Sequence, residues 1–262
     1  MKKANRKGWA VVTGATSGIG LEFSRQLARQ GYRLLLVGRR RDRLYGMKDE
    51  LKKAGVHAGI MIADLVSDSG RELLIGWMGR HRVDVFINNA GFGLAGSFLE
   101  TDVDREKQMI ELNVTAMHLL MKAALNSMKK RGAGYVLNVA SSAGLLPGGP
   151  YMAAYYATKA YVASLTQAVA EEFRLEGTGI YVGCLCPGPV DTEFNSVAEV
   201  QFALKGITAK KCVKTALSGM KKRKTVIVPT LTMKGAVTAG RLLPRKTAVS
   251  FTAKQQIKKT HG

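Results

Sequence analysis

Seven short apolar runs, each separated from the next by a longer stretch of helical period, constrain the fold of this 262-residue chain most strongly. The runs are rich in Val, Ile and Leu and span residues 9–13, 33–37, 58–62, 83–87, 135–139, 180–185 and 225–228. Such an alternation is typical of repeated βαβ units that form a parallel sheet. Because the runs lack polar alternation, both faces of the sheet should be buried. We therefore expect an α/β fold with a doubly wound parallel sheet of about seven strands and helices on both faces.

The domain organisation is predicted from the absence of any boundary within the strand-and-helix pattern. No internal repeat, low-complexity linker or composition break before residue 200 marks a second domain. We expect a single domain over residues 9–230, a basic N-terminal extension over 1–8 and a basic C-terminal segment over 231–262. No apolar run approaches the roughly 18 residues that span a bilayer, and the basic start lacks the features of a signal peptide. These patterns predict a cytoplasmic protein.

The formal net charge of +21 is concentrated at the two ends of the chain. Residues 201–262 hold 15 Lys or Arg and no Asp or Glu, whereas residues 8–200 carry a net charge of only +2. A basic tail can bind phosphates, but this one has no recognition motif and few aromatic residues to stack on bases. The pattern argues against nucleic acid as the main partner, and a nucleic-acid-associated basic protein stays an alternative.

The three cysteines and four histidines do not indicate metal or disulfide chemistry. No histidine shares a ligand-like spacing with a cysteine or another histidine, so we expect no metal site. Cys184 and Cys186 lie two residues apart in an apolar run, so on a strand they would point to the same face as buried thiols.

A glycine-rich turn follows the first apolar run and leads into a helical stretch. It reads Thr13-Gly14-Ala15-Thr16-Ser17-Gly18-Ile19-Gly20, and the next residues form an apolar stripe from Leu21 to Ala28 that ends at Gly31. Glycines here let the backbone approach a pyrophosphate, whose charge the amides at the helix N-terminus would meet. The turn predicts a dinucleotide site in a Rossmann-type fold. A tight turn without a ligand is the alternative.

Tyr155 and Lys159 have a Tyr-x-x-x-Lys spacing, which places both side chains on one face of a helix. An ammonium beside a phenol favours the phenolate and lowers the tyrosine pKa from about 10 toward neutrality, where proton exchange is efficient. Tyr156 lies three residues from Lys159 and could share that face. The spacing therefore predicts a proton-transfer pair and leaves the choice of tyrosine open.

Together with three further motifs, the glycine turn and the Tyr-Lys pair resemble the short-chain dehydrogenase/reductase family. Asn88-Asn89-Ala90-Gly91 after the fourth run matches a family element, as does Pro187-Gly188 after the sixth run, with Thr192 beyond it. Asp64, after the third run, lies where the family contacts adenine. The resemblance covers about residues 9–230 and extends to bacterial reductases that often lack an assigned substrate.

The resemblance implies roles for four side chains. Tyr155 would be the general acid and base, and Lys159 would assist it and bind the nicotinamide ribose. Ser142 would stabilise the charge that develops on the substrate oxygen. Asn113 would hold a water that connects Lys159 with bulk solvent.

The number of residues between the catalytic serine and tyrosine decides between the neighbouring candidates for each role. Ser142 lies thirteen residues before Tyr155, which matches the family's serine-to-tyrosine distance along the chain. This match favours Tyr155 over Tyr156. It also favours Ser142 over Ser141, whose expected role is in the turn.

The same resemblance implies a cofactor site along the strand ends. Its expected residues are Gly14, Thr16, Ser17, Gly18, Ile19, Gly20, Arg39, Arg40, Asp64, Leu65, Asn89, Ala90, Gly91, Tyr155, Lys159, Pro187, Gly188, Val190 and Thr192. After the second run, an NAD-binding chain needs a carboxylate for the ribose hydroxyls, but this chain has Arg39, which can bind a 2′-phosphate. Ser17 departs from the basic residue that NADP-using relatives often have at its position. We expect NADP(H).

These assignments predict an oxidoreductase that transfers a hydride between NADP(H) and a carbonyl or alcohol substrate. Five apolar residues after the sixth run favour a hydrophobic substrate, namely Phe194, Val197, Val200, Phe202 and Leu204. Relatives commonly pair through the region around 155–176, so a homodimer or homotetramer is expected. A catalytically silent dinucleotide-binding regulator is the alternative from another class.

The C-terminal segment is expected to be helical. Thr208 can cap a helix that starts at residues 209–211, and residues 231–243 mix apolar side chains with Lys234 and Arg241. One prediction is a helix packed on the domain or across a dimer interface. The other is peripheral contact with an anionic membrane.

Overall fold

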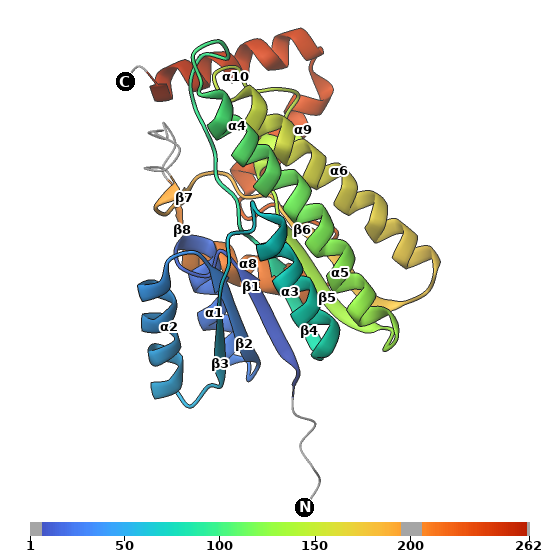
Figure 1. Cartoon of the computed structure of the whole chain (residues 1–262). Coiled ribbons are helices and arrows are strands. Elements are labelled where there is room, and N and C mark those ends of the chain that lie inside the picture. The colour runs from blue at the N-terminus through green and yellow to red at the C-terminus, as the bar shows by residue number, and fades with distance from the viewer. Residues whose placement is uncertain (1–6, 195–205, 261–262) are drawn as a thin grey trace, which may run out of the picture.

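The computed structural model describes residues 7–194 and 206–260, and its centre is a seven-stranded parallel sheet (Figure 1). The strands are β1 (Trp9–Thr13), β2 (Arg33–Gly38), β3 (Ala58–Ile62), β4 (Val83–Asn88), β5 (Ala133–Val139), β6 (Gly179–Leu185) and β9 (Val226–Ile227). Each of the seven apolar runs forms one of these strands, so the predicted fold class is confirmed. The spatial order is β3-β2-β1-β4-β5-β6-β9. The order reverses between β1 and β4, where a doubly wound sheet opens a crevice at its carboxyl ends.

Helices cover both faces of the sheet and extend beyond it. They are α1 (Gly18–Arg29), α2 (Arg41–Lys53), α3 (Asp68–Arg80), α4 (Val103–Ile110), α5 (Met117–Lys129), α6 (Ala153–Leu175), α8 (Ala209–Lys221), α9 (Leu231–Leu242) and α10 (Arg245–Thr260). On one face, residues of α1, α2 and α8 form a buried cluster that includes Val12. On the other, residues of α3, α5 and α6 form a buried cluster that includes Val11. Neighbouring residues of β1 thus enter opposite cores, and both are fully buried, as the absence of polar alternation predicted.

Two local sequence predictions also match the structure. In α1 the apolar stripe buries Phe23 and Leu27, and Gly31 lies just beyond the helix with a φ of +83°. In α8 the Thr208 hydroxyl accepts a hydrogen bond from the Lys211 amide at 3.2 Å, which satisfies one free donor of the first turn.

Three local elements were not predicted. A π-helix over Glu111–Ala116 joins α4 to α5 in one continuous rod, and a 3₁₀-helix over Ser142–Leu145 follows β5. Strands β7 (Val190–Asp191) and β8 (Ile207–Thr208) form a separate two-stranded parallel sheet. The π-helix contains Asn113, and single-turn π segments are frequent at functional sites.

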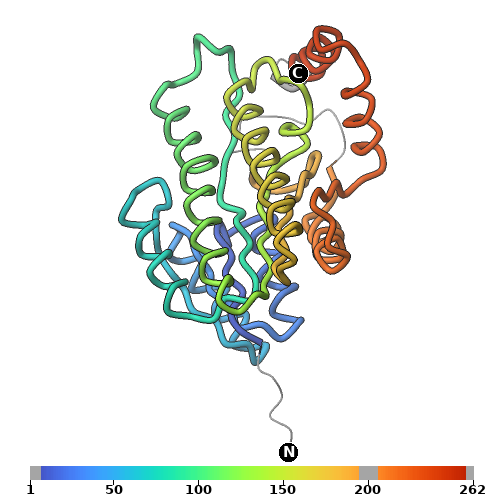
Figure 2. The backbone as a smooth tube through the Cα atoms, turned by 90° about the vertical axis from the view of Figure 1, so that its right-hand side faces the viewer, coloured from blue at the N-terminus to red at the C-terminus, as the bar shows by residue number. Residues whose placement is uncertain are grey.

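The C-terminal helices lie outside the two helical layers. In Figures 1 and 2, α10 crosses the end of the molecule toward which the strands run, and α9 connects it to the body. Along α10, Ala248, Thr252 and Gln256 are buried at intervals of one turn, so this helix packs on the domain. None of the helices in the described ranges is long and apolar enough to cross a membrane.

Candidate active site

A cavity of about 560 Å³ lies at the carboxyl ends of the central strands. Its lining includes every residue predicted to bind the cofactor except Gly20, which lies in the wall behind it. It also includes three of the four predicted catalytic residues, Ser142, Tyr155 and Lys159. Asn113 is the exception, because its side chain is buried behind the lining. The structure therefore brings together residues that are more than 170 positions apart in the sequence, from Gly14 to Thr192.

Three positions of the glycine turn, Gly14, Gly18 and Gly20, favour glycine over any residue with a side chain. Gly14 and Gly18 have φ values of +65° and +52°. A Cβ at Gly20 would lie 2.2 Å from the Gly14 carbonyl oxygen and 2.5 Å from Asn89 Nδ2. Asn89 Nδ2 in turn donates to the Thr13 carbonyl at 2.9 Å, so it braces the turn from the neighbouring strand.

The N-terminus of α1 faces this cavity through the turn. Ser17 is the N-cap residue but forms no side-chain capping bond, so the first-turn amides have no partner from that hydroxyl. Donors of this kind, together with the positive end of the helix dipole, bind phosphate groups. The turn therefore fits the pyrophosphate of a dinucleotide.

The two arginines after β2 differ in how strongly they are held. Arg40 donates to the Thr16 hydroxyl at 2.9 Å and pairs with Glu193 at 2.8 Å. Arg39 has 66% of its side chain exposed, and its ion pair within the described residues is with Asp64, at 3.7 Å. Both arginines line the cavity. Arg39 is thus held less tightly than Arg40 in the part of the chain that the structure describes.

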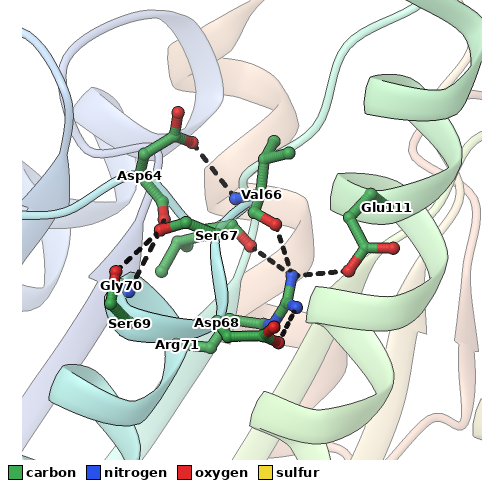
Figure 3. A network of polar contacts seen from close by, with 9 residues as sticks. Asp64, Val66, Ser67, Asp68, Ser69, Gly70, Arg71 and Glu111 are labelled. Carbon is green, nitrogen blue, oxygen red and sulfur yellow. Dashed lines mark hydrogen bonds and ion pairs between the residues drawn. The ribbon is translucent and has the colours of Figure 1, made fainter. Parts of the chain in front are cut away.

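A buried arginine that the sequence analysis missed supports the neighbouring turn (Figure 3). Arg71, in α3, is 5% exposed, and its Nη1 donates to the Val66 carbonyl at 2.7 Å and to the Leu65 carbonyl at 3.1 Å. The same Nη1 lies 2.6 Å from Glu111 Oε1, at the first residue of the π-helix. Arg71 therefore links the turn after β3, which lines the cavity, to the segment that contains Asn113.

Asn113 fixes the backbone beside Lys159. Its Nδ2 donates to the Phe92 carbonyl at 2.8 Å, and its Oδ1 accepts from the Phe92 amide at 3.1 Å. A Cβ at Gly91 would lie 2.7 Å from Asn113 Oδ1 and 3.3 Å from Lys159 Nζ. Gly91 is therefore the point at which these two side chains converge.

Tyr155 and Lys159 are both buried at the cavity wall, 7% and 5% exposed. Lys159 Nζ donates to the Val139 carbonyl at 3.0 Å and lies 5.8 Å from the centre of the Tyr155 ring. Burial lowers the pKa of Lys159 to about 8. Burial raises the pKa of Tyr155 to about 12, against the lowering effect of a hydrogen bond with the Ser141 side chain.

The direction of the Tyr155 pKa shift contradicts the sequence expectation. The ammonium of Lys159 is expected to lower it, but removal of the phenolate from water raises the pKa, and the opposing effect comes from the hydrogen bond with Ser141. The raised pKa keeps the Tyr155 hydroxyl protonated at neutral pH.

Tyr156 has a different function in the structure. Its hydroxyl accepts a hydrogen bond of 2.6 Å from Gln256 Nε2, so it anchors α10 to the start of α6. The centres of the Tyr155 and Tyr156 rings lie 6.4 Å apart, with the ring planes at 77°. This geometry favours Tyr155 as the reactive tyrosine.

The two serines after β5 are distinguished by their contacts. The Ser141 side chain hydrogen-bonds Tyr155, and its oxygen also accepts from the Ala143 amide at 3.1 Å. The Ser142 amide donates to the Pro187 carbonyl at 2.8 Å, which ties the 3₁₀-helix to the turn after β6. Ser141 is thus the serine whose side chain lowers the pKa of Tyr155 by a hydrogen bond, and Ser142, which the thirteen-residue separation selects, lines the same cavity.

Apolar side chains cluster around Tyr155 in the cavity, namely Phe92, Leu146, Met152 and Phe194. Met233 also lines the cavity, as do the polar residues Arg105, Gln108 and Gln255. The Phe194 ring lies 5.7 Å from that of Tyr155. The other apolar residues that predicted a hydrophobic substrate, Val197, Val200, Phe202 and Leu204, fall outside the described residues.

The buried cysteines lie behind this site. Cys184, in β6, and Cys186, just after it, are fully buried in the same core cluster with their sulfur atoms 3.7 Å apart, as the sequence predicted. Within the described ranges, no three or more His, Cys, Asp and Glu residues are grouped to hold a metal ion.

The doubly wound sheet, the glycine turn and the buried Tyr-Lys pair define a dinucleotide-binding oxidoreductase. The family model for short chain dehydrogenases matches residues 8–201. A Streptomyces coelicolor protein provisionally named a ketoacyl reductase is 37% identical over 187 residues, 70% of each chain. The very-long-chain 3-oxoacyl-CoA reductase of Rattus norvegicus is 31% identical over 194 residues, 72% of this chain and 61% of the rat protein.

A solved structure leads to the same family. The short-chain dehydrogenase from Sphingobium yanoikuyae in complex with NADPH is 30% identical, with a TM-score of 0.81 over 89% of this chain and 93% of that one. The chain therefore belongs to the short-chain dehydrogenase/reductase family.

Proposed function

We propose that this protein is an NADP(H)-dependent reductase of hydrophobic carbonyl compounds, and in reverse an alcohol dehydrogenase, with Tyr155 as the general acid and base. The observation that carries this proposal is the Tyr155 hydroxyl in one continuous cavity with the glycine turn. A bound reduced nicotinamide would supply the hydride that is added to the carbonyl carbon.

The residues of the chain would manage the proton and the charge. Tyr155, whose hydroxyl is protonated at neutral pH, would donate a proton to the carbonyl oxygen. Ser141 would donate a second hydrogen bond to the same oxygen and stabilise the charge that develops there. We propose Ser141 for this role in place of Ser142, because Ser141 hydrogen-bonds Tyr155.

Lys159 and Asn113 would prepare the site for this step. Lys159 would bind the nicotinamide ribose and, as a cation near the ring of Tyr155, ease the loss of its proton in the oxidative direction. Asn113 holds the Phe92 backbone and thereby the wall beside Lys159 Nζ. The water that we expect it to organise stays part of the proposal.

The preference for NADP(H) would come from Arg39 and Arg40, because a guanidinium binds a 2′-phosphate with charge-assisted hydrogen bonds. The test is kcat/KM with NADPH and with NADH, in the wild type and in Arg39→Ala. We expect the wild type to prefer NADPH and the variant to lose most of that preference. Equal preference in both proteins would remove the assignment.

The substrate class is inferred from the apolar wall and from the relatives. Four of the apolar side chains that line the cavity cluster with Tyr155, and two relatives are named as reductases of ketoacyl or 3-oxoacyl compounds. A hydrophobic ketone or acyl derivative fits such a wall. A homodimer or homotetramer remains our expectation for the assembly.

The catalytic role of Tyr155 is tested by a matched pair of tyrosine variants. Tyr155→Phe should lose turnover while it still binds NADPH, because only the proton donor is removed. Tyr156→Phe removes a hydroxyl that holds α10 and should keep turnover within about tenfold of the wild type. If Tyr155→Phe kept most of its kcat, the proposed role would be wrong. NADPH binding without turnover of any carbonyl by the wild type would favour the regulator.

A further inference from the structure

Helices α9 and α10 form a surface with an unusual composition, which we call the α9–α10 surface. Between residues 231 and 260 the sequence has no Asp or Glu. The described basic side chains are Lys234, Arg241, Arg245, Lys246 and Lys254. Large apolar side chains are exposed among them, namely Leu231 (83%), Leu242 (82%), Leu243 (45%), Phe251 (62%) and Ile257 (41%).

The two helices expose these residues because they pack on the body over only a narrow strip. In α9, Val237 is the one buried residue among those described. In α10 the buried positions recur every fourth residue through Gln256, so Lys254 and Ile257 lie on the opposite, outward side, and Phe251, 62% exposed, lies at the flank. Figure 2 shows both helices at the edge of the molecule, outside the two layers that cover the sheet.

We propose that the α9–α10 surface docks the protein on an anionic phospholipid membrane. The bases complement anionic headgroups, and the exposed leucines and Phe251 can enter the boundary between headgroups and acyl chains. Neither helix spans the bilayer, so the contact is peripheral.

The charges argue against a second copy of the chain as the occupant. A two-fold contact places the same patch on both sides. Because the described side chains of α9 and α10 include five bases and no acid, such a contact would bring like charges together. Nucleic acid also complements the positive charge of the α9–α10 surface. It offers no apolar partners for Leu231, Leu242 and Phe251, so it explains only the basic residues of this surface.

The docking has a consequence for the substrate, and this consequence rests on the proposed function. Met233 of α9 and Gln256 of α10 line the cavity. A bilayer in contact with the outer side of these helices would therefore lie close to the apolar wall beside Tyr155. A lipid-like carbonyl compound could then pass from the interface into the cavity.

The direct test is flotation of the full chain with vesicles of phosphatidylcholine alone or mixed with phosphatidylglycerol. It requires no turnover, so its outcome is independent of the proposed function. We expect the protein to float with the anionic vesicles at low salt and to be released from them at high salt. Each base removed, as in Arg245→Gln or Lys254→Gln, should weaken binding about fivefold.

Matched variants distinguish binding through the α9–α10 surface from non-specific binding of the protein to vesicles. The double variant Leu242→Ser/Phe251→Ser removes two exposed apolar side chains from the α9–α10 surface. Leu175→Ser is its control, because it removes a 71% exposed apolar side chain at the end of α6 remote from Tyr156. Lys129→Gln is the control for charge. We expect the first pair to lose vesicle binding and the two controls to keep it, with thermal unfolding and NADPH binding used to confirm that all variants fold.

The proposal is overturned if the wild type does not float with anionic vesicles, or if it floats equally with neutral ones. It is also overturned if the Leu242 and Phe251 variants bind as well as the Leu175 control. A change from dimer to monomer in these variants without any vesicle binding would assign the surface to a second copy. Binding of DNA in a mobility shift, without vesicle binding, would assign it to nucleic acid.

Discussion

Replacement of Arg71 by Met should destabilise the fold and impair the site at the same time. Arg71 donates to the Val66 carbonyl at 2.7 Å and pairs with Glu111 at 2.6 Å, almost fully buried. Removal of one partner from a buried ion pair costs about 3–5 kcal/mol. Because Glu111 keeps 34% of its side-chain surface exposed, water compensates part of the loss, and we expect about 2–3 kcal/mol.

Urea unfolding measures this loss, and Asp68→Asn is its matched control. Asp68 also pairs with Arg71 but is 88% exposed, so its removal should cost less than about 1 kcal/mol. Because Glu111 begins the π-helix that contains Asn113, Arg71→Met should lower kcat as well as raise KM for NADPH. The reasoning fails if Arg71→Met is no less stable than Asp68→Asn, or if its kinetic constants are those of the wild type.

Three further predictions concern the site itself. Ser141→Ala should lower kcat about 100-fold or more, because it removes a hydrogen-bond donor to the oxygen on which negative charge develops. Ser142→Ala should lower kcat only a few-fold. A larger loss of kcat in Ser142→Ala than in Ser141→Ala would favour Ser142, the residue predicted from the sequence. Gly20→Ala should weaken NADPH binding at least about tenfold in a titration, because its Cβ would clash with the Gly14 carbonyl; unchanged affinity would contradict the described turn. Burial lowers the pKa of Lys159 to about 8, so the folded protein loses this proton as the pH rises through that value. Carbonyl reduction, measured as kcat/KM for NADPH, should therefore be constant below about pH 8 and fall above it, and a flat profile to higher pH would show that the ammonium is not needed.

The strands and the cofactor turn were predictable because their causes are local. A run such as 83–87 is apolar without alternation only if both faces are covered, and its strand forms as expected. Gly14, Gly18 and Gly20 each meet a constraint within the turn or from the next strand, so their spacing alone predicted a tight turn between the first strand and the first helix.

The parts that the sequence did not predict depend on contacts made across the fold. Ser141 and Ser142 are adjacent, and the choice between them depends on the path of the loop before α6, in which Tyr151 has a φ of +63°. A separation counted along the sequence does not fix which of the two hydroxyls acts on the substrate, so that choice stays a prediction. The Arg71–Glu111 pair joins residues 40 positions apart, and the Tyr156–Gln256 bond joins residues 100 apart. No spacing rule relates such residues.

The expected lowering of the Tyr155 pKa failed for a related reason. The prediction considered the charge of Lys159 but not the burial of both groups, which is a property of the assembled core. Desolvation opposes the charged form of each group, so the pKa of Tyr155 rises and that of Lys159 falls. The cytoplasmic location and the assembly state stay predictions.

The central claim is that this chain reduces carbonyl compounds with NADPH through Tyr155. The most direct measurement is the transfer of deuterium from NADPH labelled at C4 of the nicotinamide to the alcohol product, across a panel of hydrophobic ketones and ketoacyl esters. We predict that the wild type places deuterium on the former carbonyl carbon and that Tyr155→Phe, with NADPH bound, forms no labelled product. Labelled product formed by Tyr155→Phe at a rate near that of the wild type would contradict the account, as would its absence from every wild-type reaction.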